Sequence, residues 1–346
     1  MYLKEVEYML KIAEEQNITR AAEKLFITPS ALTQQLTRLE SDLGVPLFHR
    51  DRRGCTPTEA GEIYLQAARE MMKLKKETYL RLQDLSARRQ GKLTVGFPPD
   101  RGASAFTSIY PKFHREYPEI SINIMETSVR RQHKLIASGD LDFGFVTLRE
   151  SQKADLEYIP ICQEELVLIL PASHPLCREA QPSNGPYPTL DPALLKNESF
   201  AMIYRLSTIY QFVEEILHSA GVIPNVLFES PRTATIINMV ESNMCCGIIP
   251  DSAATRHPSS VAFFCLPGHP SWMLYACCRR GAYLSKASRR FIQLASHYWQ
   301  NGKSPSPMAG PAGRGAFLSY SFRPPYIWRF PVPLPFPPCS SSGRST

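Results

Sequence analysis

The sequence lacks the apolar segments and the N-terminal signal that membrane and exported proteins need. No apolar run among its 346 residues approaches the ~20 residues that span a bilayer. The first ten residues, MYLKEVEYML, carry acidic side chains where an export signal has a basic end and an apolar centre. We therefore expect a cytoplasmic protein that makes no membrane contact.

Signatures of common catalytic and cofactor sites are also missing. There is no GxSxG, HExxH, P-loop or glycine-rich dinucleotide fingerprint, and the eight histidines show no ligand spacing. The nine cysteines form no CxxC pair, so we expect reduced thiols packed in cores, with a redox-sensing pair as the alternative. These absences predict that the protein is not an enzyme and has no catalytic residue, metal site or cofactor.

Acidic residues are absent from the last stretch, residues 299–346, which contains ten prolines and five basic side chains. The stretch has no helical or strand period and cannot build a core, so we expect it to be disordered. It is either an extension that binds a partner or a segment that arises from an altered reading frame or an addition. We favour the latter two.

Without this stretch the charge is nearly balanced. The net charge of +7 includes five positive charges from residues 299–346, and residues 1–89 carry 15 basic and 13 acidic side chains. Any affinity for nucleic acid must therefore come from local placement of charge. With 43% hydrophobic residues, a chain of this length can form two or three domains with apolar cores.

Residues 19–44 predict two short helices joined by a tight turn. Thr19 can cap the first helix, in which Ala21 and Ala22 leave room for another helix to cross closely. Thr28 can cap the second helix, and Pro29 suits its first position because the missing N–H costs nothing there. This arrangement is typical of a helix-turn-helix.

The second helix has an apolar inner face and a polar outer face. Leu32, Leu36 and Leu39 recur at helical spacing and must face inward. The outer face lacks acidic residues before Glu40, so its hydroxyl, amide and guanidinium groups can contact base edges without repelling phosphate. A polar helix in any three-helix bundle is the alternative. The outward residues are Ser30, Thr33, Gln34, Thr37 and Arg38.

The segment AAEKLFITPSALTQQLTRLESDLGVPLFHRDRRGCTPTEAG resembles the winged helix-turn-helix of the LysR-type transcriptional regulators. Paired alanines, Leu-Glu, Leu-Gly, Leu-Phe-x-Arg and Thr-x-x-Gly recur there at these spacings. Pro29-Ser30 stand where Gln-Pro is frequent in the family, and Gln34 replaces a frequent arginine. The resemblance implies double-stranded DNA as a partner, approached by Thr28, Pro29, Ser30, Thr33 and Gln34, and the outer face adds Arg38.

Residues 45–58 predict the wing, two short strands joined by an arginine-rich turn. Arg52 and Arg53 can lie along phosphates or enter a narrow minor groove, whereas Arg50 can fold back onto the helices. A solvated turn is the alternative. With an amphipathic helix near the N-terminus, the wing completes a DNA-binding domain over residues 1–58.

Residues 59–89 predict one long linker helix that begins after Thr58. A seam of apolar residues on a helix that stands clear of a domain needs a partner, so we expect dimerisation here. The resemblance implies antiparallel pairing of linker helices, and a homotetramer. The seam consists of Leu65, Met72 and Tyr79, flanked by Ala68 and Leu82.

Residues 90–298 alternate strands and helices, which predicts an α/β effector-binding domain with ligands at the carboxyl ends of the strands. We expect lobe I over about residues 91–160 and 270–298, and lobe II over about 161–269. The resemblance covers residues 1–298 and implies a two-lobed architecture similar to periplasmic binding proteins.

Polar residues after the predicted strands are the candidates for effector binding. Helix N-termini and arginines suit a small anion such as a carboxylate. For each residue alone, a helix cap or loop hydrogen bond is the alternative. The candidates are Asp100, Arg101, Ser104, Thr127, Thr147, Tyr204 and Arg205.

Together these features predict a ligand-responsive DNA-binding transcriptional regulator of LysR type, in which a small-molecule effector in the interlobe cleft alters DNA bending and the access of RNA polymerase. The alternative is a small-molecule binding protein or α/β enzyme with a vestigial helix-turn-helix. The non-acidic outer face and the arginine-rich wing argue against that alternative.

Overall fold

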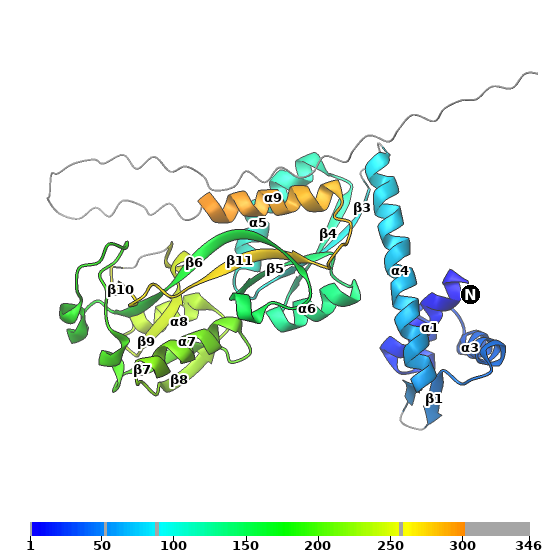
Figure 1. The fold of residues 1–346 in the computed structure, drawn as a ribbon, viewed down its shortest axis with the longest axis horizontal. Coiled ribbons are helices and arrows are strands. Elements are labelled where there is room, and N and C mark those ends of the chain that lie inside the picture. Colours follow the sequence, from blue (N-terminus) through cyan, green and yellow to red (C-terminus); the bar gives the residue numbers. More distant parts are fainter. Residues whose placement is uncertain (1, 52–53, 87–89, 256–258, 302–346) are drawn as a thin grey trace, which may run out of the picture. The chain divides into compact units, whose positions relative to one another are not determined.

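The computed structural model describes residues 2–51, 54–86, 90–255 and 259–301 (Figure 1). Two predictions fall wholly or almost wholly outside these ranges: the roles of Arg52 and Arg53, and the proline-rich stretch from residue 302 onward. The linker helix, predicted to reach residue 89, ends at Leu85 because the backbone of Ser86 is extended, and residues 87–89 lie outside the described ranges. No helix of the described residues is long and apolar enough to cross a bilayer.

The N-terminal domain contains three helices around one apolar core. Thr28 caps the third helix as expected, because its Oγ1 accepts a hydrogen bond from the N–H of Ala31 at 3.2 Å. The prediction that Thr19 caps the helix containing Ala21 and Ala22, which is the second helix of the domain, is wrong. Asn17 caps it instead, accepting from the N–H of Arg20 at 3.0 Å, since its extended backbone suits the capping position. The helices are α1 (Leu3–Glu15), α2 (Ile18–Lys24) and α3 (Pro29–Leu43).

The wing consists of two antiparallel strands, β1 (Phe48–Asp51) and β2 (Gly54–Pro57). The N–H of Cys55 donates to the carbonyl of Gln16 at 2.8 Å, which ties the second strand to the end of α1. The wing is therefore fixed to the helices by backbone contacts and not only by the chain that follows α3.

The long helix α4 (Glu59–Leu85) starts at a tightly packed contact with the wing. Thr58 Oγ1 accepts from the N–H of Gly61 at 2.9 Å, and a Cβ on Gly61 would lie 2.0 Å from the carbonyl oxygen of Leu47. Glycine is therefore required there. The recurring Thr-x-x-Gly motif thus combines a helix cap with a close backbone approach.

The expected dimer seam on α4 is wrong at its N-terminal end. Leu65 and Ala68 are fully buried, because this part of α4 packs against α1. Toward the C-terminal end of the helix, Tyr79 and Leu82 of the predicted seam are exposed. Most exposed apolar side chains of α4 lie on a stripe that shares Leu82 with that seam and in which positions recur every 11 residues, or about three turns. This stripe contains Ile63, Met71, Leu74, Leu82 and Leu85.

Lobe I of the effector-binding domain is built on a sheet in the order β4-β3-β5-β11. Strand β3 pairs in parallel with β4 and β5, as the strand-helix-strand pattern predicts, and β11 returns antiparallel to β5. Helices α5 and α9 pack against each other over one aromatic core (Figure 1). The strands are β3 (Gly91–Phe97), β4 (Ile120–Glu126), β5 (Phe143–Leu148) and β11 (Ser271–Cys278), and the helices are α5 (Gly102–Glu116), α6 (Val129–Ser138) and α9 (Lys286–Asn301).

Lobe II continues the same sheet in the order β6-β9-β7-β8, with β10 paired to β6. Strand β6 is longer than the sequence pattern predicts, and its first half pairs with β11 in lobe I. Strand β10 was not predicted. The strands are β6 (Glu157–Pro171), β7 (Ser199–Ile203), β8 (Asn225–Ser230), β9 (Cys246–Pro250) and β10 (Val261–Cys265), and the helices are α7 (Thr208–Ser219) and α8 (Thr233–Glu241). Short 3₁₀ turns are η1 (Glu150–Gln152), η2 (Pro175–Glu179), η3 (Pro192–Leu195) and η4 (Asp251–Thr255).

Strand β6 runs from lobe I into lobe II, and β11 lies beside its first half (Figure 1). Each half has its own apolar core: one is built on residues 93–161 and 274–299, and the other on residues 166–272. The two-lobed architecture predicted from the sequence is therefore present, with two crossing strands between the lobes.

Candidate nucleic-acid interface and ligand cleft

The outer face of α3 is exposed and free of acidic side chains from Pro29 to Leu39. Leu32, Leu36 and Leu39 point into the core as predicted. The amide of Gln34 and the guanidinium of Arg38 make no hydrogen bond or ion pair to any described residue. Both groups are therefore available to a partner.

Three other residues of this face have part of their hydrogen-bonding capacity occupied. Thr28 Oγ1 caps the helix and lies 3.1 Å from Ser30 Oγ. The hydroxyl of Thr33 donates to the carbonyl of Pro29 at 2.8 Å, and its side chain is half-buried. Thr33 can therefore offer a partner an acceptor lone pair or its methyl group, but not its hydroxyl proton.

Glu40 follows the non-acidic part of the face, and its carboxylate is turned toward the wing. Its Oε1 accepts from the N–H groups of Leu47 and Phe48 at 2.8 and 3.2 Å, and its Oε2 lies 2.6 Å from Arg50 Nη2. Only 15% of its side chain is exposed. The recurring Leu-Glu and Leu-Phe-x-Arg motifs thus form one unit in which the acidic charge is neutralised.

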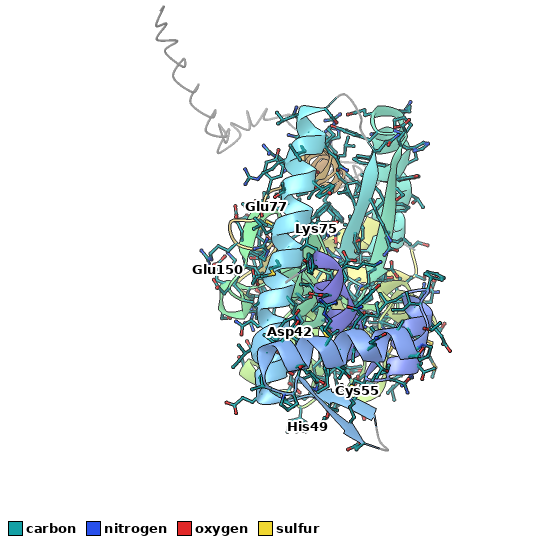
Figure 2. All side chains as sticks on the ribbon, turned by 90° about the vertical axis from the view of Figure 1, so that its right-hand side faces the viewer. Asp42, His49, Cys55, Lys75, Glu77 and Glu150 are labelled. Carbon is teal, nitrogen blue, oxygen red and sulfur yellow. The ribbon has the colours of Figure 1, made fainter. Side chains whose placement is uncertain are left out.

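The wing carries further side chains beside α3. Arg50 folds back onto Glu40, which is the alternative foreseen for it. Figure 2 shows His49 on the first wing strand and Asp42 near the C-terminal end of α3. Both side chains are exposed, so Asp42 is an acidic group at the edge of this surface.

A narrow cleft of about 70 Å³ lies between the lobes, at the carboxyl ends of β3, β5 and β7. Four of the predicted effector-binding residues line it: Asp100, Arg101, Thr147 and Tyr204. The hydroxyl-bearing residues Ser128 and Ser207, which precede α6 and α7, line it as well. A drug-sized ligand needs roughly 300–1,000 Å³, so the cleft is closed to such molecules in this conformation.

Arg101 is paired with a buried carboxylate at the back of the cleft. Its Nη1 donates to both oxygens of Glu164 at 2.8 and 2.7 Å, and its Nη2 donates to Ser252 Oγ at 3.1 Å. The indole N–H of Trp272 donates to the same carboxylate at 3.1 Å. The positive charge of Arg101 is therefore balanced before any ligand enters.

Further contacts join the two lobes across the cleft. Asp100, at a positive φ of 76°, accepts hydrogen bonds from the N–H and the hydroxyl of Thr233 at the start of α8. The hydroxyl of Thr208 donates to the carbonyl of Thr147 at 2.8 Å. These bonds hold the lobes in the narrow arrangement.

A third interlobe contact lies at the rim. Arg149 makes a two-pronged ion pair with Glu215 of α7, with both N···O distances at 2.7 Å. Its guanidinium also lies over the ring of Phe212, 4.4 Å from the centroid. The planar fork of arginine suits this combined carboxylate and aromatic contact.

Three of the predicted effector-binding residues lie outside the lining of this cleft. The exposed side chain of Arg205 donates to Glu229 at 2.8 Å, and Ser104 is exposed on α5. The backbone N–H of Thr127 donates to Phe97 in the sheet. These are the helix and loop hydrogen bonds that the alternative reading of the sequence allowed.

Four residues that bond to the cleft residues Arg101 and Asp100, or to the carboxylate paired with Arg101, were not predicted from the sequence. They are Glu164, Trp272, Ser252 and Thr233. One signal was present, because Glu164 and Glu165 begin the strand segment EELVLILP, directly before its apolar run. A carboxylate in a buried strand needs a cationic partner. The partner, Arg101, is distant in sequence and could not be identified from the pattern.

The adjacent cysteine pairs lie in the apolar cores. Cys245, Cys246, Cys277 and Cys278 are all buried. Burial raises the pKa of the Cys278 thiol to about 12, and it also raises the pKa of the Cys246 and Cys277 thiols. The reactive thiolate is therefore strongly disfavoured at these positions.

Comparison with known proteins identifies both domains. Residues 3–62 match the model of the bacterial regulatory helix-turn-helix protein, lysR family, and residues 86–300 match that of the LysR substrate binding domain. The Hca operon transcriptional activator HcaR of Escherichia coli is 28% identical over 300 residues, covering 85% of this chain and 97% of HcaR. YybE of Bacillus subtilis, an uncharacterized HTH-type transcriptional regulator, is 29% identical over 252 residues, covering 72% of this chain and 83% of YybE.

Solved structures share the fold. A variant of full-length OxyR from Pseudomonas aeruginosa superposes with a TM-score of 0.64 at 24% identity, covering 86% of this chain and 97% of OxyR. CbnR complexed with its target DNA superposes with a TM-score of 0.54 at 20% identity, covering 86% of this chain and 99% of CbnR. With both family models matched in the expected order, the chain belongs to the LysR family of transcriptional regulators.

Proposed function

We propose that α3 reads a specific DNA sequence in the major groove and that the wing contacts the flanking backbone. The observation that carries this proposal is the outer face of α3, which is exposed, polar and free of acidic side chains, while Glu40 is turned away and neutralised by Arg50. A surface of this kind lowers the electrostatic cost of approaching phosphate.

The side chains of the face have different roles in this proposal. Gln34 offers both an amide donor and an acceptor, the pair of groups that matches adenine, and Arg38 offers a cation for phosphate or guanine. Thr28 and Pro29 mainly set the start of α3, and Ser30 and Thr33 supply short polar contacts. Arg52 and Arg53 are proposed to contact phosphates or the minor groove.

We also propose that the protein works as a homodimer through α4, with a homotetramer as the next level of assembly. The exposed stripe of Ile63, Met71, Leu74, Leu82 and Leu85 is the surface that a second α4 would cover. Two DNA-binding domains held by such a dimer would contact two half-sites, and a partly palindromic target follows from that symmetry. This role places the protein in the cytoplasm, where RNA polymerase is a further partner.

The cleft between the lobes is proposed to bind a small carboxylate or similar anion. Ser128 precedes α6 without capping it through its side chain, so the N–H groups of the first turn of α6 are free of that bond. A helix N-terminus carries partial positive charge and free donors, which suit an anion. Because Arg101 is already paired with Glu164, the N-terminus of α6 and the Tyr204 hydroxyl are the stronger candidates for ligand contact.

Entry of an effector must widen the cleft and break interlobe bonds. The Asp100–Thr233 and Thr208–Thr147 contacts are those nearest the cavity. An effector that binds the wider arrangement of the lobes more tightly shifts the equilibrium from the narrow to the wide arrangement. This shift changes the geometry of the assembled dimers. The expected readout is a changed DNA bend and therefore altered access of RNA polymerase.

The DNA proposal is tested by footprinting the purified full chain on the DNA upstream of its own gene at near-physiological salt. We expect protection of a partly palindromic site. Gln34→Glu should weaken binding about 10–100-fold, because it places a carboxylate against base edges and phosphate. Gln66→Glu is the matched control, since it makes the same charge change at an exposed position of α4 and should leave binding nearly unchanged.

The same experiment separates the regulator from the alternative with a vestigial helix-turn-helix. Absence of protection by a folded protein, or equal effects of Gln34→Glu and Gln66→Glu, would favour the alternative.

The effector proposal is tested by thermal denaturation with a set of small mono- and dicarboxylates. An active compound should stabilise the parent protein, and Ser128→Ala and Tyr204→Phe should reduce that shift. Arg205→Ala should retain it, because Arg205 is bonded to Glu229 outside the cavity.

A further inference from the structure

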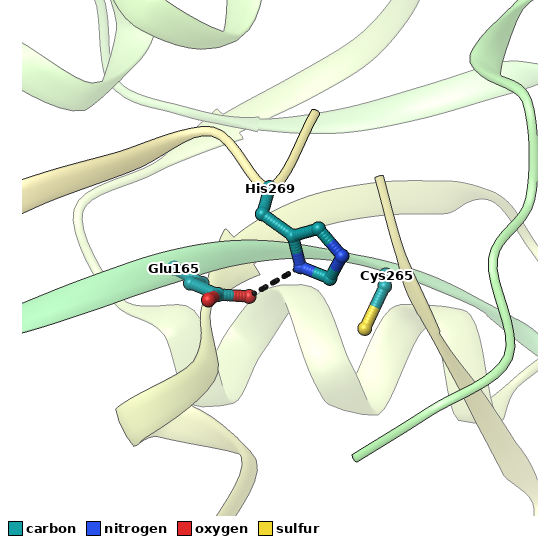
Figure 3. Close-up of side chains that lie close together, drawn as sticks. All are labelled: Glu165, Cys265 and His269. Atoms are coloured by element: carbon teal, nitrogen blue, oxygen red, sulfur yellow. Dashed lines mark hydrogen bonds and ion pairs between the residues drawn. The ribbon is translucent and has the colours of Figure 1, made fainter. Parts of the chain in front are cut away.

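Three metal-ligating side chains of different chemistry meet in lobe II, away from the cleft. Glu165 lies on β6, Cys265 is the last residue of β10, and His269 lies in the turn before β11 (Figure 3). One potential ligand atom from each, a carboxylate oxygen, the thiol sulfur and an imidazole nitrogen, lies within 4.8 Å of the other two. Cys265 is buried, Glu165 is half-buried and His269 is exposed.

The geometry of the group is close to that of a bound ion. Glu165 Oε2 lies 3.0 Å from His269 Nδ1. In a tetrahedral zinc site, bonds of 2.0–2.3 Å place neighbouring ligand atoms roughly 3.2–3.8 Å apart. The carboxylate and imidazole are therefore already near that spacing, and the sulfur needs a shift of about 1 Å or less.

Space beside the ligands is kept open by a glycine. A Cβ on Gly185 would lie 2.8 Å from Cys265 Sγ and 3.2 Å from His269 Cε1. Any side chain at position 185 would therefore crowd both ligands. In the stretch Cys265-Leu-Pro-Gly-His269, three residues separate the cysteine from the histidine, a Cys-x-x-x-His spacing.

We propose that Glu165, Cys265 and His269 bind one Zn²⁺ ion, or a transition ion of similar softness, with a water in the fourth position. Thiolate, imidazole and carboxylate are the ligand types that Zn²⁺ accepts. Binding deprotonates the thiol and displaces any proton shared by Glu165 and His269, so affinity rises with pH.

The site lies beside the two strands that connect the lobes. Glu165 is adjacent to Glu164, which holds Arg101 of lobe I, and His269 leads directly into β11. A bound ion would connect β6 to the turn before β11. Strands β6 and β11 are the two strands that cross between the lobes. The ion would thus add a link between β10 and these strands within lobe II.

The test uses the full chain after removal of metal with a chelator. Zn²⁺ is titrated against a competing chromophoric chelator, and Co²⁺ is then used as a spectroscopic probe. We expect one tight site per chain, and a thiolate-to-Co²⁺ charge-transfer band that identifies the sulfur ligand.

Variants assign the site. Cys265→Ser should abolish the charge-transfer band, and His269→Gly and Glu165→Gln should each weaken Zn²⁺ binding by more than the 10–100-fold typical of residues that only support a ligand. His269 has a positive φ of 49°, which glycine adopts freely, so His269→Gly should stay folded. The matched controls are Cys162→Ser on β6 and His218→Ala at the exposed end of α7, which should bind Zn²⁺ like the parent.

Two results would overturn the proposal. One is a folded parent protein with no saturable Zn²⁺ binding at micromolar concentrations. The other is Zn²⁺ binding that survives His269→Gly and Cys265→Ser unchanged. Because binding is measured without DNA or effector, neither result depends on the proposed DNA and effector roles.

Discussion

The guanidinium of Arg101 and the carboxylate of Glu164 form a largely buried ion pair. The Glu164 side chain has no exposed surface, and that of Arg101 is 17% exposed. Since Arg101 precedes α5 of lobe I and Glu164 lies on the crossing strand β6, the pair fixes lobe I to the strand on which lobe II is built. Arg101, which the sequence predicts to bind an effector, thus also stabilises the connection between the lobes.

Removing one partner of this pair should be costly. Arg101→Ala leaves the Glu164 carboxylate buried without its cation, and we expect a loss of about 3–5 kcal/mol in the free energy of unfolding. Urea denaturation followed by tryptophan fluorescence measures it, because Trp272 donates to the same carboxylate. The double variant Arg101→Ala/Glu164→Gln should recover most of the loss, since a neutral amide can still accept from Trp272. Equal stability of the single variant and the parent would contradict this account.

Glu40 should be important for holding the wing against α3. Glu40→Ala removes the acceptor of the Leu47 and Phe48 N–H groups and the partner of Arg50, so we expect a loss of about 1–3 kcal/mol in the stability of the N-terminal domain. Thermal denaturation followed by circular dichroism measures the change. Asp42→Ala on the same helix is the control, and as an exposed substitution it should shift stability by no more than about 0.5 kcal/mol.

Arg38 should contribute to DNA affinity through charge. If it contacts phosphate, Arg38→Ala weakens binding to all sequences and lowers the slope of log K against log salt by about one. Fluorescence anisotropy at several salt concentrations measures that slope. Arg69→Ala on α4 makes the same charge change at an exposed site and should leave the slope unchanged. Equal slopes for Arg38→Ala and the parent would show that Arg38 does not contact phosphate.

Local features of the sequence predicted most of the elements. The inward leucines of α3, the Thr28 cap and the alternating strands and helices of lobe I depend on short spacings, and the structure has them as expected. The sequence also allowed Arg50 to fold back onto the helices instead of contacting DNA. The ion pair of Arg50 with Glu40 shows that it folds back.

Features that depend on distant residues could not be predicted. Leu65 and Ala68 follow the heptad pattern of a dimer seam, but α1 covers them, and only the tertiary fold decides which stripe of α4 stays exposed. Arg101 and Arg205 looked alike as anion ligands until their partners Glu164 and Glu229 were known. Residue type predicted the chemistry of the cleft, whereas the pairing determines which charges remain available.

The stability of lobe I should depend on pH through His133. This imidazole is half-buried, its Nε2 lies 3.1 Å from the hydroxyl of Tyr158, and burial lowers its pKa below the usual 6.5. The unfolded chain then binds more protons than the folded one between the lowered pKa and 6.5, so the free energy of unfolding falls as pH drops through that window. Each unit by which the folded-state pKa of His133 is lowered reduces the free energy of unfolding by about 1.4 kcal/mol once the pH is below both pKa values.

His133→Gln should flatten this dependence, because glutamine does not titrate and can still bond to Tyr158. The measurement is urea denaturation at several values between pH 7.5 and pH 5, a range above that in which carboxylates with lowered pKa, such as Glu215, lose their contribution. His218→Gln at the exposed end of α7 is the control and should keep the parent's slope. If the curves of His133→Gln and the parent run parallel, another group is responsible for the loss of stability in acid.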